Sequence, residues 1–524
     1  MKNKVRSISI LLYLIIIWGF SSIVKFDISE PTHKFDGFGE SFNVKTSSSI
    51  YTNATVISDG FGGTYWNDGS SYTPSIATDN SGNIHVVWRD DTDGPWGVDT
   101  EIMYASYYSS AGWSNVSVIS DGFGGTYWND GSSYTPSIAT DNSGNIHVVW
   151  RDDTDGSWGA DAEIIYANYS TSAGWSNVTV ISDGFGGTYW NDGDSSWPSI
   201  ATDNSGNIHV VWYDFTYGPW GADAEIMYTN YSSSAGWSNA TVISDGFGGT
   251  YWNDGGSYTP SIATDNSGNI HVVWYDDTDG AWGVDPEIMY ASYSSPAGWS
   301  NATVISDGFG GTYWNDGFCQ LPSIAIDNSG NIHVVWEDWT IGPWGDDGEI
   351  MYASYSSSAG WSNVTVISDG FGGTYWNDGT SSWPSISTDD SGNIHVVWED
   401  WTNGPWGVDP EIMYASYSSS AGWSNATVIS DGFGGTYWNN GGSAEPSIAI
   451  DNNRNIHVVW EDNTDGPWGT DWEIMYTLLF EVVDSGASDN IIMIIIIVVS
   501  IVGVVGVGIA LFVLRKKNRA ITGE

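Results

Sequence analysis

Short apolar runs separated by polar turn residues are the dominant pattern of the chain. In the first complete repeat, β-branched and aromatic residues concentrate in residues 74–78, 83–88, 101–107 and 113–119. Segments rich in Gly, Asp, Asn and Ser lie between these runs. Runs of this length and composition, bounded by turn residues, predict β-strands. We therefore expect four strands in each repeat, here called the first to the fourth strand.

The pattern returns at a fixed interval. The motif Ser-Asp-Gly-Phe-Gly-Gly-Thr-Tyr-Trp-Asn begins at Ser58, and each later copy starts 62 residues after the previous one, at Ser120, Ser182, Ser244, Ser306, Ser368 and Ser430. A fixed period of this size indicates a repeat architecture. Seven four-stranded units suit a β-propeller, in which radial repetition leaves few open sheet edges. The predicted fold is therefore all-β, a seven-bladed β-propeller of 62-residue repeats.

The two ends of the repeat array complement one another. The seventh repeat stops near residue 480 without a fourth strand, whereas residues 52–58 stand alone before the first repeat. Residues 52–58 match residues 424–430, a fourth strand, in all but the first position. We therefore expect the N-terminal strand to complete the last blade, which removes the exposed edge of an open array.

Strand direction assigns the connections to faces. Consecutive antiparallel strands alternate in direction, so the short turns at 79–82 and 109–112 share one face. The longer loops at 58–73 and 89–100, rich in Gly, Asp and Trp, share the other. We call this second surface the long-loop face.

The termini carry targeting signals. Basic residues followed by an apolar run predict a secretory signal peptide over residues 1–27, with an uncleaved anchor as the alternative. Residues 28–49 form a linker, 50–480 the propeller and 481–490 a stalk. Residues 491–514 are apolar and long enough for one transmembrane helix, and the basic tail 515–524 is expected to stay in the cytoplasm. The sequence thus predicts a single-pass type I membrane protein with an extracellular propeller and a stalk directed away from the long-loop face.

Charge narrows the class of partner. The formal net charge is −50, and only Arg89, Arg151 and Arg454 are basic between Lys45 and Arg515. Nucleic acid is excluded as a partner because its phosphates are neutralised by Lys and Arg. The alternative is that acidity provides solubility or suits a saline habitat. The single cysteine, Cys319, excludes an intrachain disulfide.

The repeats differ mainly in their long loops. The position after Trp88 and its equivalents reads Arg89, Arg151, Tyr213, Tyr275, Glu337, Glu399 and Glu461. Each repeat also places aromatics equivalent to Trp66 and Trp96 beside Asn and Asp residues. Rings next to amide and carboxylate acceptors can bind sugars, so these positions are candidate ligand contacts. Two alternatives stay open: surface loops vary freely, and Trp66 and Trp96 could form small satellite cores.

The loop at 89–100 also gathers carboxylates. Asp90, Asp93, Asp99 and Glu101 are candidate ligands for Ca²⁺, a hard cation that prefers oxygen donors. No cofactor is required by any motif, and the alternative role of these Asp residues is to cap turn amides. His85 and its equivalents lie in the second strands, away from the axis, where they cannot meet at one ion. We expect them to be buried and hydrogen-bonded.

Each fourth strand carries an Asn-x-Ser/Thr triplet. The candidate N-glycosylation sites are Asn53, Asn115, Asn177, Asn239, Asn301, Asn363 and Asn425. Period-two alternation makes exposure of these residues plausible. The alternative is a polar outer strand that discourages edge pairing.

The repeated Ser-Ile-Ala-Thr-Asp-Asn-Ser-Gly-Asn-Ile-His-Val-Val-Trp, followed by Glu-Ile-Met-Tyr, resembles the blades of sialidase-like propellers of prokaryotic, especially archaeal, surface proteins. The resemblance spans about residues 50–480 and implies the fold. Sialidases hold a substrate carboxylate with three arginines and use a Tyr/Glu pair. Here only Arg89, Arg151 and Arg454 are available, and Arg454 lies in a turn on the opposite face. The Asp-box-like turn at Asp79 is also one residue too long, so the resemblance does not carry the activity.

No catalytic residue is assigned, because a near-symmetric ring repeats each carboxylate whereas catalysis needs residues in unique environments. The function that the sequence favours is a membrane-anchored cell-surface propeller that binds glycans or extracellular proteins. One alternative is a glycoside hydrolase or lyase that uses an unlike pair such as Glu337 and Glu399. The other is a passive coat or spacer. The oligomeric state is left open.

Overall fold

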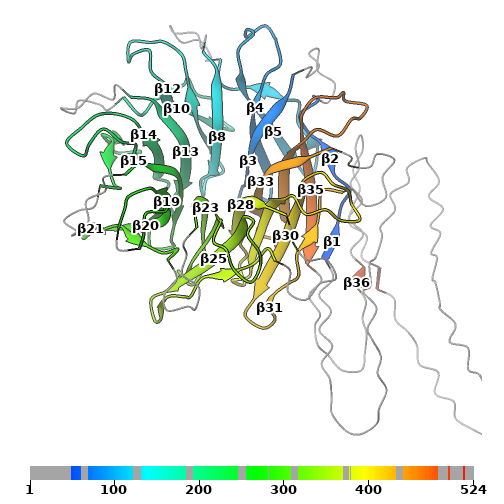
Figure 1. Cartoon of the computed structure of the whole chain (residues 1–524). Helices are drawn as coiled ribbons and strands as arrows, with labels where there is room; N and C mark the ends of the chain where they lie inside the picture. Colours follow the sequence, from blue (N-terminus) through cyan, green and yellow to red (C-terminus); the bar gives the residue numbers. More distant parts are fainter. Residues whose placement is uncertain are drawn as a thin grey trace, which may run out of the picture. The chain divides into compact units, whose positions relative to one another are not determined.

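The computed structural model describes residues 49–60, 69–121, 131–183, 193–245, 255–280, 282–307, 317–369, 377, 379–431, 439, 441–481, 494–495 and 512–513. Seven antiparallel sheets are arranged around a ring (Figure 1). Six are each built from one repeat, and the seventh combines the last repeat with the N-terminal segment. The predicted seven-bladed β-propeller is confirmed. We number the blades 1 to 7 in chain order.

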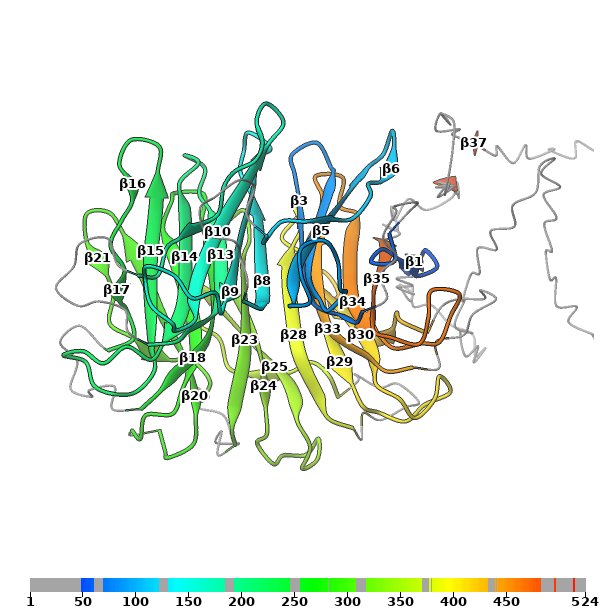
Figure 2. The ribbon, with the colours of Figure 1, turned by 90° about the horizontal axis from the view of Figure 1, so that it is seen from above.

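The first strand of each blade lies innermost and contacts the first strands of both neighbouring blades. These inner strands are β3 (Ser71–Thr78), β8 (Ser133–Thr140), β13 (Ser195–Thr202), β18 (Ser257–Thr264), β23 (Cys319–Ile326), β28 (Ser381–Thr388) and β33 (Ser443–Ile450). Several of them surround the middle of the ring in Figure 1. In the view from above, the strands of neighbouring blades stand side by side (Figure 2).

The second and third strands form the middle of each sheet. The second strands are β4 (Ile84–Asp90), β9 (Ile146–Asp152), β14 (Ile208–Asp214), β19 (Ile270–Asp276), β24 (Ile332–Asp338), β29 (Ile394–Asp400) and β34 (Ile456–Asp462). The third strands are β5 (Glu101–Tyr108), β10 (Glu163–Ser170), β15 (Glu225–Ser232), β20 (Glu287–Ser294), β25 (Glu349–Ser356), β30 (Glu411–Ser418) and β35 (Glu473–Glu481).

The outer strand is interrupted, which the sequence pattern did not predict. The continuous strand expected at 113–119 is instead a pair of short strands, β6 (Gly112–Trp113) and β7 (Ser117–Val118), and both pair with β5. Ser114 causes the break: its N–H donates to Ser106 O (2.7 Å), and its Oγ accepts from Ser106 N (3.0 Å). Since the side-chain oxygen takes the place of the carbonyl, the main chain leaves the ladder at Asn115.

The same interruption recurs around the ring. The other outer pairs are β11 (Gly174–Trp175) and β12 (Thr179–Val180), β16 (Gly236–Trp237) and β17 (Thr241–Val242), β21 (Gly298–Trp299) and β22 (Thr303–Val304), β26 (Gly360–Trp361) and β27 (Thr365–Val366), and β31 (Gly422–Trp423) and β32 (Thr427–Val428).

The N-terminal strand closes blade 7, as predicted. β1 (Ser49–Tyr51) and β2 (Thr55–Val56) both pair antiparallel with β35. Thr52 adds two hydrogen bonds to the same strand: its N–H donates to Leu478 O (2.9 Å), and its Oγ1 accepts from Leu478 N (3.0 Å). The start of the propeller is therefore fastened to its end by hydrogen bonds and by the packing of Val56 and Ile57 into the core.

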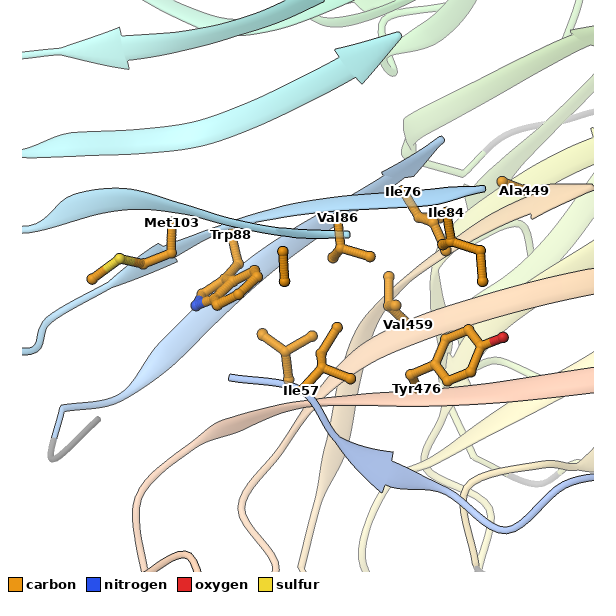
Figure 3. Close-up of a cluster of buried hydrophobic side chains, with 11 residues drawn as sticks. Ile57, Ile76, Ile84, Val86, Trp88, Met103, Ala449, Val459 and Tyr476 are labelled. Carbon is orange, nitrogen blue, oxygen red and sulfur yellow. The ribbon is translucent and has the colours of Figure 1, made fainter. Parts of the chain in front are cut away.

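The hydrophobic core is divided among the seven blade interfaces. In the cluster of Figure 3, Ile76, Val86 and Trp88 of blade 1 pack against residues of blade 7, including Val459 and Tyr476. The Trp88 side chain is 0% exposed, and Trp113 meets the Tyr476 ring edge to face at 5.1 Å. Both tryptophans thus pack between blades.

The face opposite the long loops is held by side-chain bonds that pass from blade to blade. Asn80 donates to Asn142 O (3.3 Å) and Asn142 to Asn204 O (3.2 Å), and the series continues through Asn266 to Asn328. Asn452 of blade 7 donates to Asn80 O (3.0 Å). Asp390 stands at the Asn position in blade 6 and accepts from Asn328 (3.3 Å). Short turns and these bonds make this face uniform, which leaves the long-loop face as the variable one.

A second, separate unit contains β36 (Ile494–Ile495), which pairs antiparallel with β37 (Phe512–Val513). None of the described residues belongs to a helix long and apolar enough to cross a membrane. Most of the predicted transmembrane segment 491–514 lies outside the described residues, as do the predicted signal peptide and cytoplasmic tail and most of the linker and stalk. These assignments stay predictions.

Candidate ligand-binding face

A network of buried polar groups holds the start of each long loop. Asp90 ends β4 and is 1% exposed; it accepts hydrogen bonds from Ser71 Oγ (2.7 Å), Trp88 Nε1 (3.1 Å) and Thr92 N (2.9 Å). Burial raises the pKa of Asp90, although these donors oppose the shift. The equivalent Asp152, Asp214, Asp276, Asp338, Asp400 and Asp462 are held in the same way. In blade 5 the Cys319 thiol replaces the serine hydroxyl, 3.2 Å from Asp338 Oδ2.

Glu101 lies opposite Asp90 at the start of β5 and is 0% exposed. Ser120 Oγ donates to its carboxyl group, and Ile102 N in turn donates to Ser120 Oγ (2.8 Å). The other oxygen, Oε1, is buried without a hydrogen-bond partner. Burial raises the pKa of Glu101 to about 9, with Asp99 among the neighbours that add to the shift. Glu101 is therefore uncharged near neutral pH.

The remaining candidate calcium ligands are spread out. Asp93 is exposed and Asp99 is half-buried. Among the residues that the structure describes, no three His, Cys, Asp or Glu side chains are grouped so that they could hold a metal ion. The Ca²⁺ assignment to Asp90, Asp93, Asp99 and Glu101 stays a prediction.

Trp96 takes part in holding its own loop. Its indole N–H donates to Thr92 O (3.1 Å), and the ring packs against the core between blades 7 and 1. A Cβ at Gly94 would lie 2.2 Å from this ring, so the fold requires glycine there. These contacts match the satellite-core alternative for Trp96, while Trp66 lies outside the described residues.

The position after Trp88 divides the ring into three sectors. Blades 1 and 2 form a basic sector, in which Arg89 lies 4.9 Å from the Tyr72 ring centroid and 5.0 Å from that of Tyr134. Arg151 lies over the same Tyr134 ring at 5.7 Å. The two guanidinium groups also pair with Asp91 (3.4 Å) and Asp153 (3.0 Å).

Blades 3 and 4 form an aromatic sector. Tyr258 contacts both Tyr213 (centroids 5.3 Å apart) and Tyr275 (5.1 Å, stacked). Tyr275 continues to Phe318 of blade 5 at 5.9 Å. Phe215, 41% exposed, contacts Tyr213 and extends the apolar surface into solvent.

Blades 5 to 7 form an acidic sector. Glu337, Glu399 and Glu461 are 3%, 6% and 7% exposed. Trp339 Nε1 donates to Glu337 Oε1, and Trp401 Nε1 donates to Glu399 Oε1, both at 2.7 Å. Trp339 and Trp401 are nevertheless 39% and 52% exposed. Burial, aided by the charge of Glu337, raises the pKa of Glu399 to about 7.

Glu445 joins this sector from the inner strand of blade 7. Its backbone N–H donates to Glu399, and burial together with the charges of Glu461 and Glu399 raises the pKa of Glu445. The pKa of Glu461 is raised by burial too, against the opposing effect of a hydrogen bond from Thr73 N (2.9 Å). The carboxyl groups of Glu399, Glu445 and Glu461 thus interact electrostatically in blades 6 and 7.

Glu445 belongs to a ring of residues that were not among the candidate site residues. Each inner strand has a bulge whose residue has a positive φ of 43° to 52°, although none of these residues is glycine: Thr73, Thr135, Trp197, Thr259, Leu321, Trp383 and Glu445. Such a backbone costs about 1–3 kcal/mol per residue and tends to occur at functional sites. The available signal was that each residue directly precedes a proline and changes type between repeats.

Two of these residues meet across the ring. The Trp197 ring of blade 3 stacks on the Trp383 ring of blade 6, with centroids 5.4 Å apart and an interplanar angle of 26°. Blades 3 and 6 are separated by two blades on one side and three on the other. The two indoles therefore meet only because both side chains extend inward toward the axis.

Other candidate residues lie away from this centre. His85 is 2% exposed, its Nδ1 is 2.9 Å from Tyr104 Oη, and burial lowers its pKa, so the expected buried, hydrogen-bonded histidine is confirmed. Arg454 lies in the turn between β33 and β34, at the opposite end of the strands from Arg89. The asparagines of the seven sequons are all exposed, in the interruption of each outer strand.

The comparisons with known proteins concern the fold. No protein-family profile and no curated protein matches the chain. A solved structure of a PL25 ulvan lyase bound to -[GlcA(1-4)Rha3S]- covers 79% of this chain and 95% of its own, with 13% identity and a TM-score of 0.50. The chain has the propeller fold of that lyase.

Sialidase structures lie further away. The NanB sialidase from Streptococcus pneumoniae has 13% identity over 81% of this chain and 70% of its own, with a TM-score of 0.39. The intramolecular trans-sialidase from Ruminococcus gnavus has 11% identity over 78% and 93%, with a TM-score of 0.38. The structural neighbours of this propeller are thus polysaccharide lyase and sialidase-like propellers, at the level of fold.

Proposed function

We propose that the protein is a membrane-anchored cell-surface propeller that binds glycans through its long-loop face. The observation that supports this most is the difference between sectors. The blades are nearly identical elsewhere, yet the same strand position supplies arginine, tyrosine and glutamate in turn. Unlike groups brought together in a symmetric scaffold give a site that recognises one orientation of a ligand.

The exposed aromatic residues favour a carbohydrate as the ligand. Trp339 and Trp401 keep large parts of their rings in solvent while their N–H groups are fixed to buried carboxylates. A ring held in this way offers a flat apolar surface at little cost in conformational entropy, and acceptors lie beside it. Sugars present both an apolar face and hydroxyl donors.

The test uses the full chain in detergent and a broad glycan panel, scored for retention and for released sugar. We expect retention without release. Trp401→Ala should weaken binding by about 1–2 kcal/mol, roughly 5- to 30-fold. Val408→Ala, at an exposed apolar position of the same loop in blade 6, is the matched control and should leave binding unchanged. Equal loss in both variants, or retention of no glycan, would contradict the proposal.

The acidic sector also supports a second candidate, a glycoside hydrolase or lyase. Glu399 has a pKa of about 7 beside other carboxyl groups, and carboxyl groups with separated pKa values act as acid and base in sugar cleavage. Released sugar in the same assay, abolished by Glu399→Gln, would favour this candidate over binding alone.

A further inference from the structure

Partly exposed aromatic rings follow one another across blades 3 to 5. The Phe215 ring centroid lies 6.3 Å from that of Tyr258, and Tyr258 stacks on Tyr275 at 5.1 Å. Tyr275 contacts Phe318 at 5.9 Å, and Trp339 N donates to Phe318 O (3.1 Å). Each step is a direct contact, so these residues form one continuous surface and not a set of isolated exposed side chains.

The surface continues into blade 6. A Cβ at Gly348 of blade 5 would lie 3.2 Å from the Trp339 ring and 3.0 Å from the methyl group of Thr380. Trp401 N donates to Thr380 O (3.0 Å), so Thr380 links the Trp339 loop to Trp401. We call this surface the aromatic band; its rings are those of Phe215, Tyr258, Tyr275, Phe318, Trp339 and Trp401.

The exposed aromatic residues are not needed to hold the loops. The position of Phe215, Trp339 and Trp401 is occupied by aspartate in blades 1, 2 and 4. The same loop bond forms in both cases: the indole N–H of Trp96 in blade 1 donates to Thr92 O (3.1 Å), and that of Trp220 in blade 3 donates to Thr216 O (3.0 Å). Exposed apolar side chains that form a continuous patch indicate a binding surface.

The charge of these blades restricts which glycans fit. No lysine or arginine occurs between Arg151 and Arg454, so blades 3 to 6 contain no basic residue. Asp277, two residues after Tyr275, is exposed in the loop of blade 4. A uronate or a sulfated sugar would meet carboxylates here without any basic residue, and like charges repel. A neutral sugar instead offers hydroxyl donors to Asp277 and apolar faces to the rings.

We propose that the aromatic band binds a neutral, extended glycan chain, with several consecutive sugar units lying along it from blade 3 to blade 6. This inference rests on the proposed function, because it specifies which glycans the long-loop face selects. The band is longer than one sugar unit, so a long chain makes contacts that a disaccharide lacks. A second copy of this protein fits less well, because two surfaces without basic residues would repel each other.

The experiment varies the length and the charge of the glycan. Full-length protein in detergent is titrated with the dimers and hexamers of β-1,4-linked glucose, mannose and xylose, at about 0.15 M salt, where the Debye length is about 8 Å. The hexamer of β-1,4-linked glucuronic acid is the anionic counterpart of the glucose hexamer. We expect a neutral hexamer to bind more tightly than its dimer by about tenfold or more, and the uronate hexamer to bind more weakly than the neutral one by a similar factor.

Variants test whether the chain lies on the band. Phe215→Asp and Trp339→Asp each introduce the residue that blades 1, 2 and 4 have at this loop position, so both proteins should fold. Each should weaken binding of the neutral hexamer by about threefold to tenfold. Val98→Asp is the matched control, because Val98 is 84% exposed in blade 1, outside the band, and Asp346 occupies the equivalent position in blade 5. It adds the same charge and should leave binding unchanged.

The outcomes separate the two proposals. Equal affinity for the dimer and the hexamer of every sugar, equal affinity for the neutral and the uronate hexamer, or equal losses in Phe215→Asp and Val98→Asp would overturn the band as the site of a neutral chain. Retention of other glycans on the broad panel would then still support glycan binding. Failure of every glycan, neutral or charged, would overturn both proposals and direct the search to a protein partner.

Discussion

The stack of Trp197 on Trp383 gives the sharpest test of the ring. The two residues are far apart in the chain and lie in blades that share no interface, but their rings are 5.4 Å apart. We consider Trp197→Ala, Trp383→Ala and the double variant. If the rings touch across the axis, each single substitution removes the same contact and the effects on stability cannot add.

The size of the deviation follows from the geometry. Stacked or offset aromatic pairs with centroids 4.5–7 Å apart are worth about 0.5–1.5 kcal/mol beyond the area that they bury. At 5.4 Å and 26° the pair lies within this range. We therefore expect the double variant to be less destabilised than the sum of the single variants by about 1 kcal/mol.

Urea unfolding followed by circular dichroism measures the free energy of unfolding of all four proteins. The control cycle pairs Trp197→Ala with Leu321→Ala, the equivalent bulge residue of blade 5, whose side chain has no ring to stack. That cycle should be additive to within about 0.5 kcal/mol. An additive Trp197–Trp383 cycle would refute the contact across the axis.

Three further predictions concern closure, titration and modification. Ile57 is 1% exposed and anchors the closing strand, so Ile57→Ala should lower the free energy of unfolding by about 2–5 kcal/mol. Ile119→Ala is the equivalent change in blade 1, and a much smaller loss of stability in Ile57→Ala than in Ile119→Ala would argue against closure. The pKa of Glu399 is about 7 in the folded protein and about 4.5 in the unfolded chain. Between these pH values the native state retains a proton that the unfolded chain loses. The free energy of unfolding should therefore fall as pH rises through this range, by about 3 kcal/mol in total. Glu399→Gln should remove this part of the pH dependence. If urea unfolding gave the variant and the wild type the same change in stability between pH 5 and 8, the prediction would be contradicted. Finally, expression in a host that glycosylates Asn-x-Ser/Thr should add glycans at the exposed Asn115 and its equivalents. Mass spectrometry detects them as site-specific masses that are lost on enzymatic deglycosylation. Absence of glycan from every sequon would count against the accessibility of these asparagines.

The repeat allowed the fold to be predicted from the sequence. A period of 62 residues, four apolar runs and a displaced copy of residues 424–430 were sufficient for blade number, strand order and closure. The broken outer strand was missed because the pattern of residues 113–119 fits a continuous strand. The break depends on one hydroxyl, that of Ser114, which replaces a main-chain acceptor.

The candidate site could be predicted from the sequence only in part. The sequence singled out Glu337, Glu399 and Glu461 because they differ from Arg89 at the same repeat position. It could not assign Glu445 to the same site, since that residue comes from a different strand and reaches Glu399 only through the inner bulge. Nor could it pair Trp197 with Trp383, because contacts across an axis depend on how far each side chain extends in three dimensions.

The closing strand has a consequence for assembly. Blade 7 receives β1 and β2 through non-covalent contacts alone, and residues 52–58 are almost identical to an internal fourth strand. An open blade 7 therefore cannot distinguish its own strand from that of another molecule, and only the high effective concentration of the tethered strand favours closure within one chain. At high protein density during refolding, exchange of this strand would link propellers head to tail, and since such a contact need not close, the product would be open chains of molecules.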